Sequence, residues 1–95
     1  MNKEEITVLI VALAKLSSSS APSAEWYIFG SFLRGHSPES DIDLLILYQD
    51  EYEPKIIRRI LAPLAYDVLL DITFITFEEE KELQFLSTEE HSRIY

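Results

Sequence analysis

The chain has no cysteine, and it has only two glycines, Gly30 and Gly35, among its 95 residues. The lack of cysteine excludes a disulfide framework and a thiolate metal site. Basic residues are also scarce: 8 lysines and arginines stand against 17 aspartates and glutamates, so the formal net charge is −9. Because nucleic-acid affinity rests largely on basic contacts to phosphates, this charge argues against DNA or transfer RNA as a substrate. It is compatible with a small molecule or a basic protein partner.

Long apolar segments are missing as well. No apolar run approaches the length that spans a membrane. The N-terminus lacks the basic region, apolar core and cleavage site of a secretory signal. We therefore expect a cytoplasmic location. With 47% hydrophobic residues, the chain has enough apolar side chains for a modest core, and its length predicts one domain over residues 1–95.

Apolar periodicity and capping patterns predict an alternation of helices and strands. Helices are expected over residues 3–16, after the capping pair Asn2 and Glu5, and from Pro54 until Pro63 ends the helical spacing. A second capping pair, Thr76 and Glu79, predicts a short acidic helix over residues 77–86. Strands are expected over residues 26–29, 41–48 and 68–76. This order predicts an α/β (α+β) fold with a small mixed sheet backed by helices, whereas residues 87–95 show no clear pattern.

Two aspartates open the second predicted strand. Residues two apart in a strand point to the same face, so Asp41 and Asp43 should project together while Ile42 and Leu44 face the other way. Two neighbouring carboxylates repel each other unless a cation lies between them. Magnesium prefers oxygen ligands and is usually held by one or two carboxylates plus substrate phosphates. The spacing therefore indicates a divalent metal site, against the alternative of two solvent-facing aspartates.

A glycine and a serine end the preceding strand, at Gly30 and Ser31. Ser31 could cap a short helix that ends at Arg34, and the amide groups of such a turn would face an anion. Arg34 is a candidate phosphate contact, with simple surface solvation as its alternative. His36 lies in a polar, turn-rich segment and is interpreted as a loop residue.

The order of these motifs resembles the signature of the nucleotidyltransferase superfamily typified by DNA polymerase beta. In that signature an apolar strand is followed by Gly-Ser, about ten residues, and then Asp-x-Asp, as at residues 26–43 here. The resemblance is closest to the stand-alone minimal nucleotidyltransferases, and it implies the nucleotidyltransferase fold for most of the chain. It implies that Gly30, Ser31 and nearby amides contact the terminal phosphates of ATP, with Mg²⁺ at Asp41 and Asp43. The segment from Ser31 to Asp41 is one residue shorter than in many members.

The resemblance also implies a third carboxylate on a later strand, which completes the metal site and helps to deprotonate the acceptor. Asp71 lies inside the strand predicted over residues 68–76. A carboxylate buried there would be costly without a cation, which favours Asp71 for this role. Asp67 is the competitor, but its place where a helix ends suits a capping or linking role better. The alternative for Asp71 is an exposed residue on an edge strand.

Three functions fit the sequence. The first, implied by the resemblance, is transfer of AMP from ATP to a hydroxyl, with a tyrosine of a HEPN-type partner toxin as acceptor and this chain as antitoxin. The second is a binding antitoxin that neutralises the toxin by contact alone. The third is a small-molecule nucleotidyltransferase that acts on an antibiotic or a sugar, although no appended substrate domain is visible. An oligomer is compatible with each of them.

Overall fold

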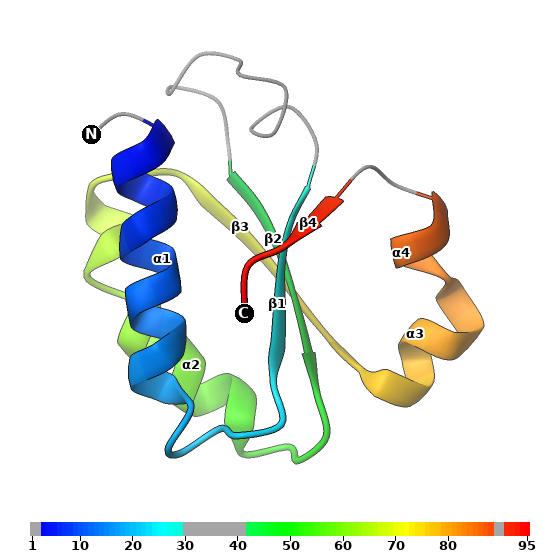
Figure 1. Ribbon diagram of the computed structural model, residues 1–95. Helices are drawn as coiled ribbons and strands as arrows, with labels where there is room; N and C mark the ends of the chain where they lie inside the picture. The colour runs from blue at the N-terminus through cyan, green and yellow to red at the C-terminus, as the bar shows by residue number, and fades with distance from the viewer. Residues whose placement is uncertain (1–2, 30–41, 89–90) are drawn as a thin grey trace.

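The computed structural model describes residues 3–29, 42–88 and 91–95 (Figure 1). Four strands form one mixed sheet in the order β3-β2-β1-β4, and this confirms the predicted fold class. The strands are β1 (Glu25–Phe29), β2 (Ile42–Tyr48), β3 (Leu70–Thr76) and β4 (His91–Arg93). The helices are α1 (Lys3–Ser17), α2 (Glu53–Leu61), the short 3-10 helix η2 (Leu64–Tyr66), α3 (Phe77–Leu83) and α4 (Phe85–Thr88). Within the described ranges, none of the helices has the length and apolar character that a bilayer crossing requires.

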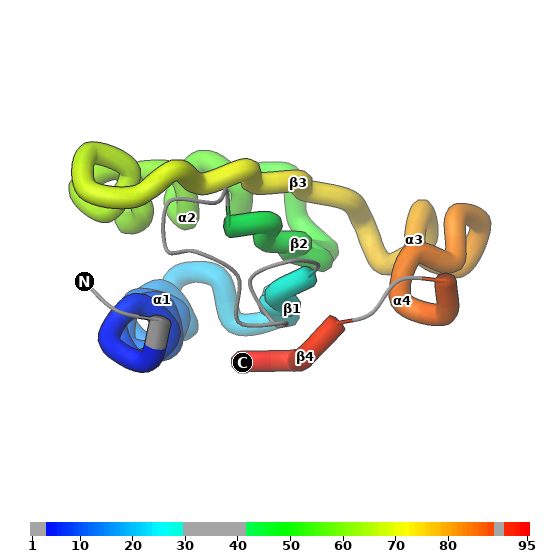
Figure 2. Tube along the Cα trace, turned by 90° about the horizontal axis from the view of Figure 1, so that it is seen from above, coloured from blue at the N-terminus to red at the C-terminus, as the bar shows by residue number. Residues whose placement is uncertain are grey.

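Helices α1 and α2 cover one face of the sheet, while α3 and α4 lie on the other side (Figures 1 and 2). Alternation along the strands builds the larger core, because every second residue points toward α1 and α2. Ile42, Leu44 and Ile46 of β2 are buried there. In α1, Ile6, Ile10 and Ala14 recur at four-residue spacing and face these strands. The predicted helices over residues 3–16 and from Pro54 are thus present and amphipathic.

The two pairings of β2 have opposite directions. β1 runs antiparallel to β2, with Phe29 opposite Asp43. β3 runs parallel to β2, with Asp43 opposite Asp71. The connection from β2 to β3 passes through α2 and η2, the crossover that a parallel pair requires. β3 begins at Leu70, two residues after the predicted start, and Asp67 caps the end of η2 as its alternative role required.

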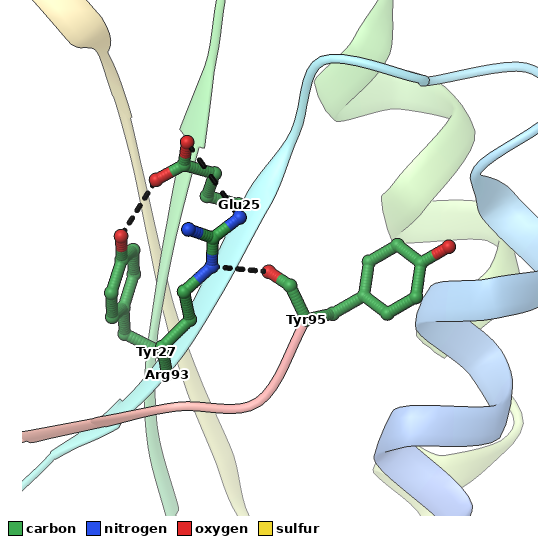
Figure 3. Close-up of polar contacts among 4 residues, drawn as sticks. All are labelled: Glu25, Tyr27, Arg93 and Tyr95. Carbon is green, nitrogen blue, oxygen red and sulfur yellow. Dashed lines mark hydrogen bonds and ion pairs between the residues drawn. The ribbon is translucent and has the colours of Figure 1, made fainter.

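The last segment adds a fourth strand that the sequence pattern did not indicate. β4 pairs antiparallel with β1, placing His91 opposite Phe29 and Arg93 opposite Tyr27. Side chains reinforce this pairing (Figure 3). The Glu25 carboxylate accepts a hydrogen bond from the Tyr27 hydroxyl at 2.6 Å and lies 3.8 Å from the Arg93 guanidinium. Burial of Tyr27, together with this hydrogen bond, raises its pKa to about 12, so the phenol stays protonated at neutral pH.

The predicted acidic helix over residues 77–86 is divided in two. Thr76 and Glu79 form the expected capping box at the start of α3. The helix then stops at Gln84, whose φ of 53° lies in the left-handed region. The Glu80 carboxylate accepts hydrogen bonds from the backbone N–H groups of Phe85 (3.2 Å) and Leu86 (2.9 Å). These bonds start α4 in a new direction, so a single straight helix was the wrong prediction. Asn2, of the first predicted capping pair, lies outside the described residues.

A buried carboxylate connects the two turns at the end of the sheet where β1 begins and β2 ends. Glu53 is fully buried. It accepts hydrogen bonds from the Ser23 hydroxyl at 2.8 Å and from the backbone N–H groups of Asp50 (2.9 Å) and Gln49 (3.2 Å). Burial alone would raise the pKa of Glu53, but these donors outweigh it and hold the pKa below its ordinary value of 4.5.

Replacing Glu53 with glutamine should destabilise the protein at neutral pH. In Glu53→Gln the amide oxygen can still accept from the N–H groups of Gln49 and Asp50. These hydrogen bonds lose their charge assistance, however, which costs roughly 1 kcal/mol of unfolding free energy. Because the folded pKa is depressed, the stability that Glu53 contributes is present above its unfolded pKa and is lost as the pH falls through the folded pKa. Urea unfolding at neutral and acidic pH measures both effects, and the gap between the two proteins should narrow in acid.

Glu51→Gln is the matched control, since Glu51 is exposed in the same turn. It should change the unfolding free energy by less than about 0.5 kcal/mol. Equal stability of wild type and Glu53→Gln at neutral pH would contradict the assigned role of Glu53.

Candidate active site

Two of the predicted site carboxylates lie side by side. Asp43 and Asp71 are directly opposite each other in the parallel pairing of β2 and β3. Neighbouring strands are about 4.8 Å apart, and residues opposite each other point to the same face. Asp43 therefore projects beside Asp71, as the resemblance implied for the second and third carboxylates.

The face that carries these aspartates is the one turned away from α1 and α2. Ile42 and Leu44 are buried in the core on the helix side, so Asp43 between them points to the opposite face, as predicted. Farther along the same face, Leu45 and Leu47 pack with Tyr27 and Ile75 in a second apolar cluster. The carboxylates thus lie at one end of a face whose other end is apolar.

A pocket of about 300 Å³ lies on this face beside the carboxylates. Asp43 and Asp71 line it together with Thr73 of β3 and Leu45 of β2. Leu44 and two aromatic residues, Phe29 from β1 and Phe85 from α4, complete the lining. The volume is at the small end of the range for small-molecule sites. The pocket therefore combines a paired negative charge with apolar, aromatic walls.

The row that begins with the two aspartates continues across the whole sheet. Asp71, Asp43, Phe29 and His91 are successive register partners on β3, β2, β1 and β4. The His91 ring contacts the Phe29 ring, with 5.6 Å between the ring centroids. The phenyl ring of Phe29 thus lies between a pair of carboxylates and an imidazole.

The structure contradicts the predicted burial of the Asp71 carboxylate. β3 is an edge strand of the sheet, and the Asp71 side chain is exposed. No burial cost therefore requires a cation at this position. What singles out Asp71 is its register with Asp43 and its place at the pocket.

The other predicted site residues lie outside the described part of the chain. These are Gly30, Ser31, Arg34 and Asp41, and the loop residue His36 lies there as well. Among residues 3–29, 42–88 and 91–95, no three His, Asp or Glu side chains are grouped closely enough to hold a metal ion. Asp43 and Asp71 are thus the two predicted metal ligands that the structure describes.

The family model for polymerase beta nucleotidyltransferases matches residues 14–95, which include every strand of the sheet. The chain belongs to this family. No curated protein and no solved structure matched the chain in the corresponding comparisons. Membership of the family supports a nucleotidyltransferase activity in general, and it agrees with the mixed sheet and the carboxylates on its open face.

Nucleotidyltransferases of this family generally use divalent metal ions such as Mg²⁺, and the described donors fit such an ion. Asp43 and Asp71 supply carboxylate oxygens from adjacent strands, on one face and at a pocket. Mg²⁺ is typically bound by one or two carboxylates together with substrate phosphates. Two aspartates at this spacing satisfy that requirement from the protein's side.

Sequence reasoning missed the aromatic lining of the pocket. Phe29 is the last residue before Gly30, and the sequence pattern indicated only that it belongs to an apolar strand. Phe85 lies in a segment predicted as a continuous helix, and His91 lies in a segment without a clear pattern. The positions of Phe85 and His91 depend on the break at Gln84 and on the pairing of β4 with β1, which local sequence does not specify.

The like charges at Asp43 and Asp71 should make the metal-free protein less stable than a variant that lacks one of them. Like charges directly opposite each other on neighbouring strands destabilise the pairing. Asp71→Asn should therefore raise the thermal midpoint in the absence of divalent ions. Adding Mg²⁺ should raise the midpoint of the wild type more than that of the variant, as thermal scans can measure.

Asp67→Asn is the control, because Asp67 is exposed at the end of η2 and away from the pocket. It should respond to Mg²⁺ as the wild type does. An Asp71→Asn protein that gains as much from Mg²⁺ as the wild type would contradict a shared cation site.

Proposed function

We propose that this nucleotidyltransferase moves AMP from ATP to a hydroxyl group at the pocket beside Asp43 and Asp71. The observation that carries the proposal is the register of these two aspartates on one face of β2 and β3. Their position supports it further, since Phe29 lines the pocket, and Gly30 and Ser31 follow Phe29 directly in the sequence.

The chain's own residues would hold the reactants in order. Gly30, Ser31 and Arg34 would bind the terminal phosphates. Asp41, Asp43 and Asp71 would hold Mg²⁺, which when bound stabilises charge on the attacking and leaving oxygens. Most catalysis in this type of transfer comes from such positioning and charge stabilisation.

The bond changes are those of a displacement at the alpha phosphorus of ATP. The acceptor oxygen forms a bond to this phosphorus, and the bond from phosphorus to the pyrophosphate oxygen breaks. Asp71, which is exposed and lines the pocket, would accept the proton that the acceptor hydroxyl loses. Pyrophosphate leaves, and the acceptor carries AMP.

The proposed acceptor is a side-chain hydroxyl of a partner protein, with a tyrosine of a HEPN-type toxin as the leading candidate and this chain as its antitoxin. The net charge of −9 disfavours nucleic acid and would steer a basic partner surface toward the chain. Neutralisation of such a toxin by contact alone is a second candidate function. A paired carboxylate at a pocket favours the enzyme, since binding alone needs no such pair.

Transfer can be tested with labelled nucleoside triphosphates, Mg²⁺ and the protein encoded beside this gene. The expected product is that protein with one added AMP, identified by mass spectrometry. Asp43→Asn should lower the rate about 100-fold or more, because metal binding supplies several kcal/mol of charge stabilisation.

Asp50→Asn changes an exposed carboxylate in the turn after β2 and should transfer at the wild-type rate. Modification of an antibiotic or sugar, with none on the neighbouring protein, would favour the small-molecule reaction instead. Toxin neutralisation that survives Asp43→Asn without any transfer would favour the binding function.

A further inference from the structure

Hydrogen bonds and apolar packing fix the position of Phe85 in the aromatic half of the pocket, and the transfer of AMP alone does not explain this arrangement. Phe85 begins α4 and lines the pocket opposite the sheet. Its backbone N–H is held by the Glu80 carboxylate, which also binds the N–H of Leu86. Leu86 in turn packs against the apolar cluster around Leu45. Phe85 is therefore anchored on both sides while its own side chain stays 36% exposed.

The pocket lies on one particular side of the two aspartates. Asp43 and Asp71 are each the second residue of their strands, near the end of the sheet where β1 finishes at Phe29. The pocket continues from them along the strands to Leu45 and Thr73. It thus extends from the carboxylates away from the end at which residue 30 follows β1.

In-line displacement then indicates on which side of the two aspartates the leaving group lies and on which side the acceptor lies. The attacking and leaving oxygens lie on opposite sides of the phosphorus. Under the proposed function, pyrophosphate leaves toward the end of the sheet where β1 finishes at Phe29. The acceptor oxygen must therefore approach from the opposite side, where the pocket lies.

The lining selects the chemistry of the acceptor. Phe29 and Phe85 offer ring faces and edges, and Leu45 offers an apolar floor. Aromatic rings favour offset or edge-to-face contact with another ring. Asp43 and Asp71 repel an anion but accept a hydrogen bond from a neutral hydroxyl. A flat apolar ring with a hydroxyl at its end matches both parts of the pocket.

We propose that the pocket between Phe29 and Phe85 seats the phenol ring of the acceptor, with its hydroxyl directed toward Asp43 and Asp71. This inference rests on the proposed function and specifies its acceptor subsite. Phe85 is the residue that selects a phenol over an aliphatic hydroxyl. Glu80 is a positioning residue, since it acts through the backbone of Phe85 and Leu86.

The test uses para-cresol, which reproduces the tyrosine side chain, and follows its binding by NMR of the isotopically labelled chain. Cresol should shift the resonances of Phe85, Leu45 and Thr73. Phe85→Leu keeps the apolar bulk but removes the ring, and it should weaken cresol binding about threefold to tenfold. Leu83→Ala, which truncates an exposed apolar side chain at the end of the preceding helix α3, should leave cresol binding unchanged.

Two results would overturn the subsite. One is cresol binding with the same affinity in Phe85→Leu as in the wild type, or binding that shifts resonances outside the pocket. The other is binding of adenosine in the pocket that Phe85→Leu weakens, while cresol binding is unchanged. The pocket would then hold the base of the nucleotide and not the acceptor.

Kinetics separate this inference from the proposed function. With a tyrosine peptide as acceptor, Phe85→Leu should raise the KM for the peptide and leave the KM for ATP unchanged. Cresol binding with normal Phe85 dependence, but no transfer to any hydroxyl, would count against the proposed function alone.

Discussion

The in-register parallel pairing of β2 with β3 is the constraint on which the site depends. It sets Asp43 beside Asp71 on the open face and Leu44 beside Ile72 on the helix-covered face. A slip of one residue would exchange the faces of every β3 side chain. It would then bring Asp71 into the apolar core and place Ile72 at the pocket. Burial of the apolar set therefore fixes the position of the carboxylate pair.

One face of the sheet carries the main apolar core, and the other face carries the candidate site. Against α1 and α2 the strands bury a continuous apolar core that includes Trp26 and Ile46. On the other side, α3 and α4 pack on the apolar end of the face and leave the carboxylate end open. The break at Gln84, set by the Glu80 carboxylate, turns α4 so that Phe85 reaches the pocket. The pocket is thus a consequence of how the second layer ends.

Local rules were sufficient for part of this arrangement. Strand alternation correctly predicted that the side chain of Asp43 points to the face opposite that of Ile42 and Leu44. The capping box correctly predicted where α3 begins. The pairing of Asp43 with Asp71 followed only from the family resemblance, because register between strands separated by a helix depends on tertiary packing. β4 has three residues, too few to show a periodic pattern.

Hydrogen bonds to two carboxylates, those of Glu53 and Glu80, account for the rest of what the sequence could not show. The sequence pattern put Glu53 in an acidic turn, yet Glu53 is fully buried, and the hydroxyl of Ser23, thirty positions earlier, donates a hydrogen bond to it. The helix predicted over residues 77–86 followed local propensity, and the Glu80 carboxylate overrode that propensity at Gln84. In both cases a charged side chain binds backbone N–H groups, which composition alone does not reveal.

The proposed catalytic function requires that Asp43 and Asp71 together hold a divalent ion on the open face of the sheet. Paramagnetic Mn²⁺, which prefers the same oxygen ligands as Mg²⁺, tests it directly through broadening of assigned amide resonances. The amide resonances of Asp43 and Asp71 should broaden at the lowest Mn²⁺ concentration, and Asp43→Asn should weaken the broadening at both. Broadening that begins instead at the acidic first turn of α3, Glu78–Glu80, or that is unchanged in Asp43→Asn, would contradict it.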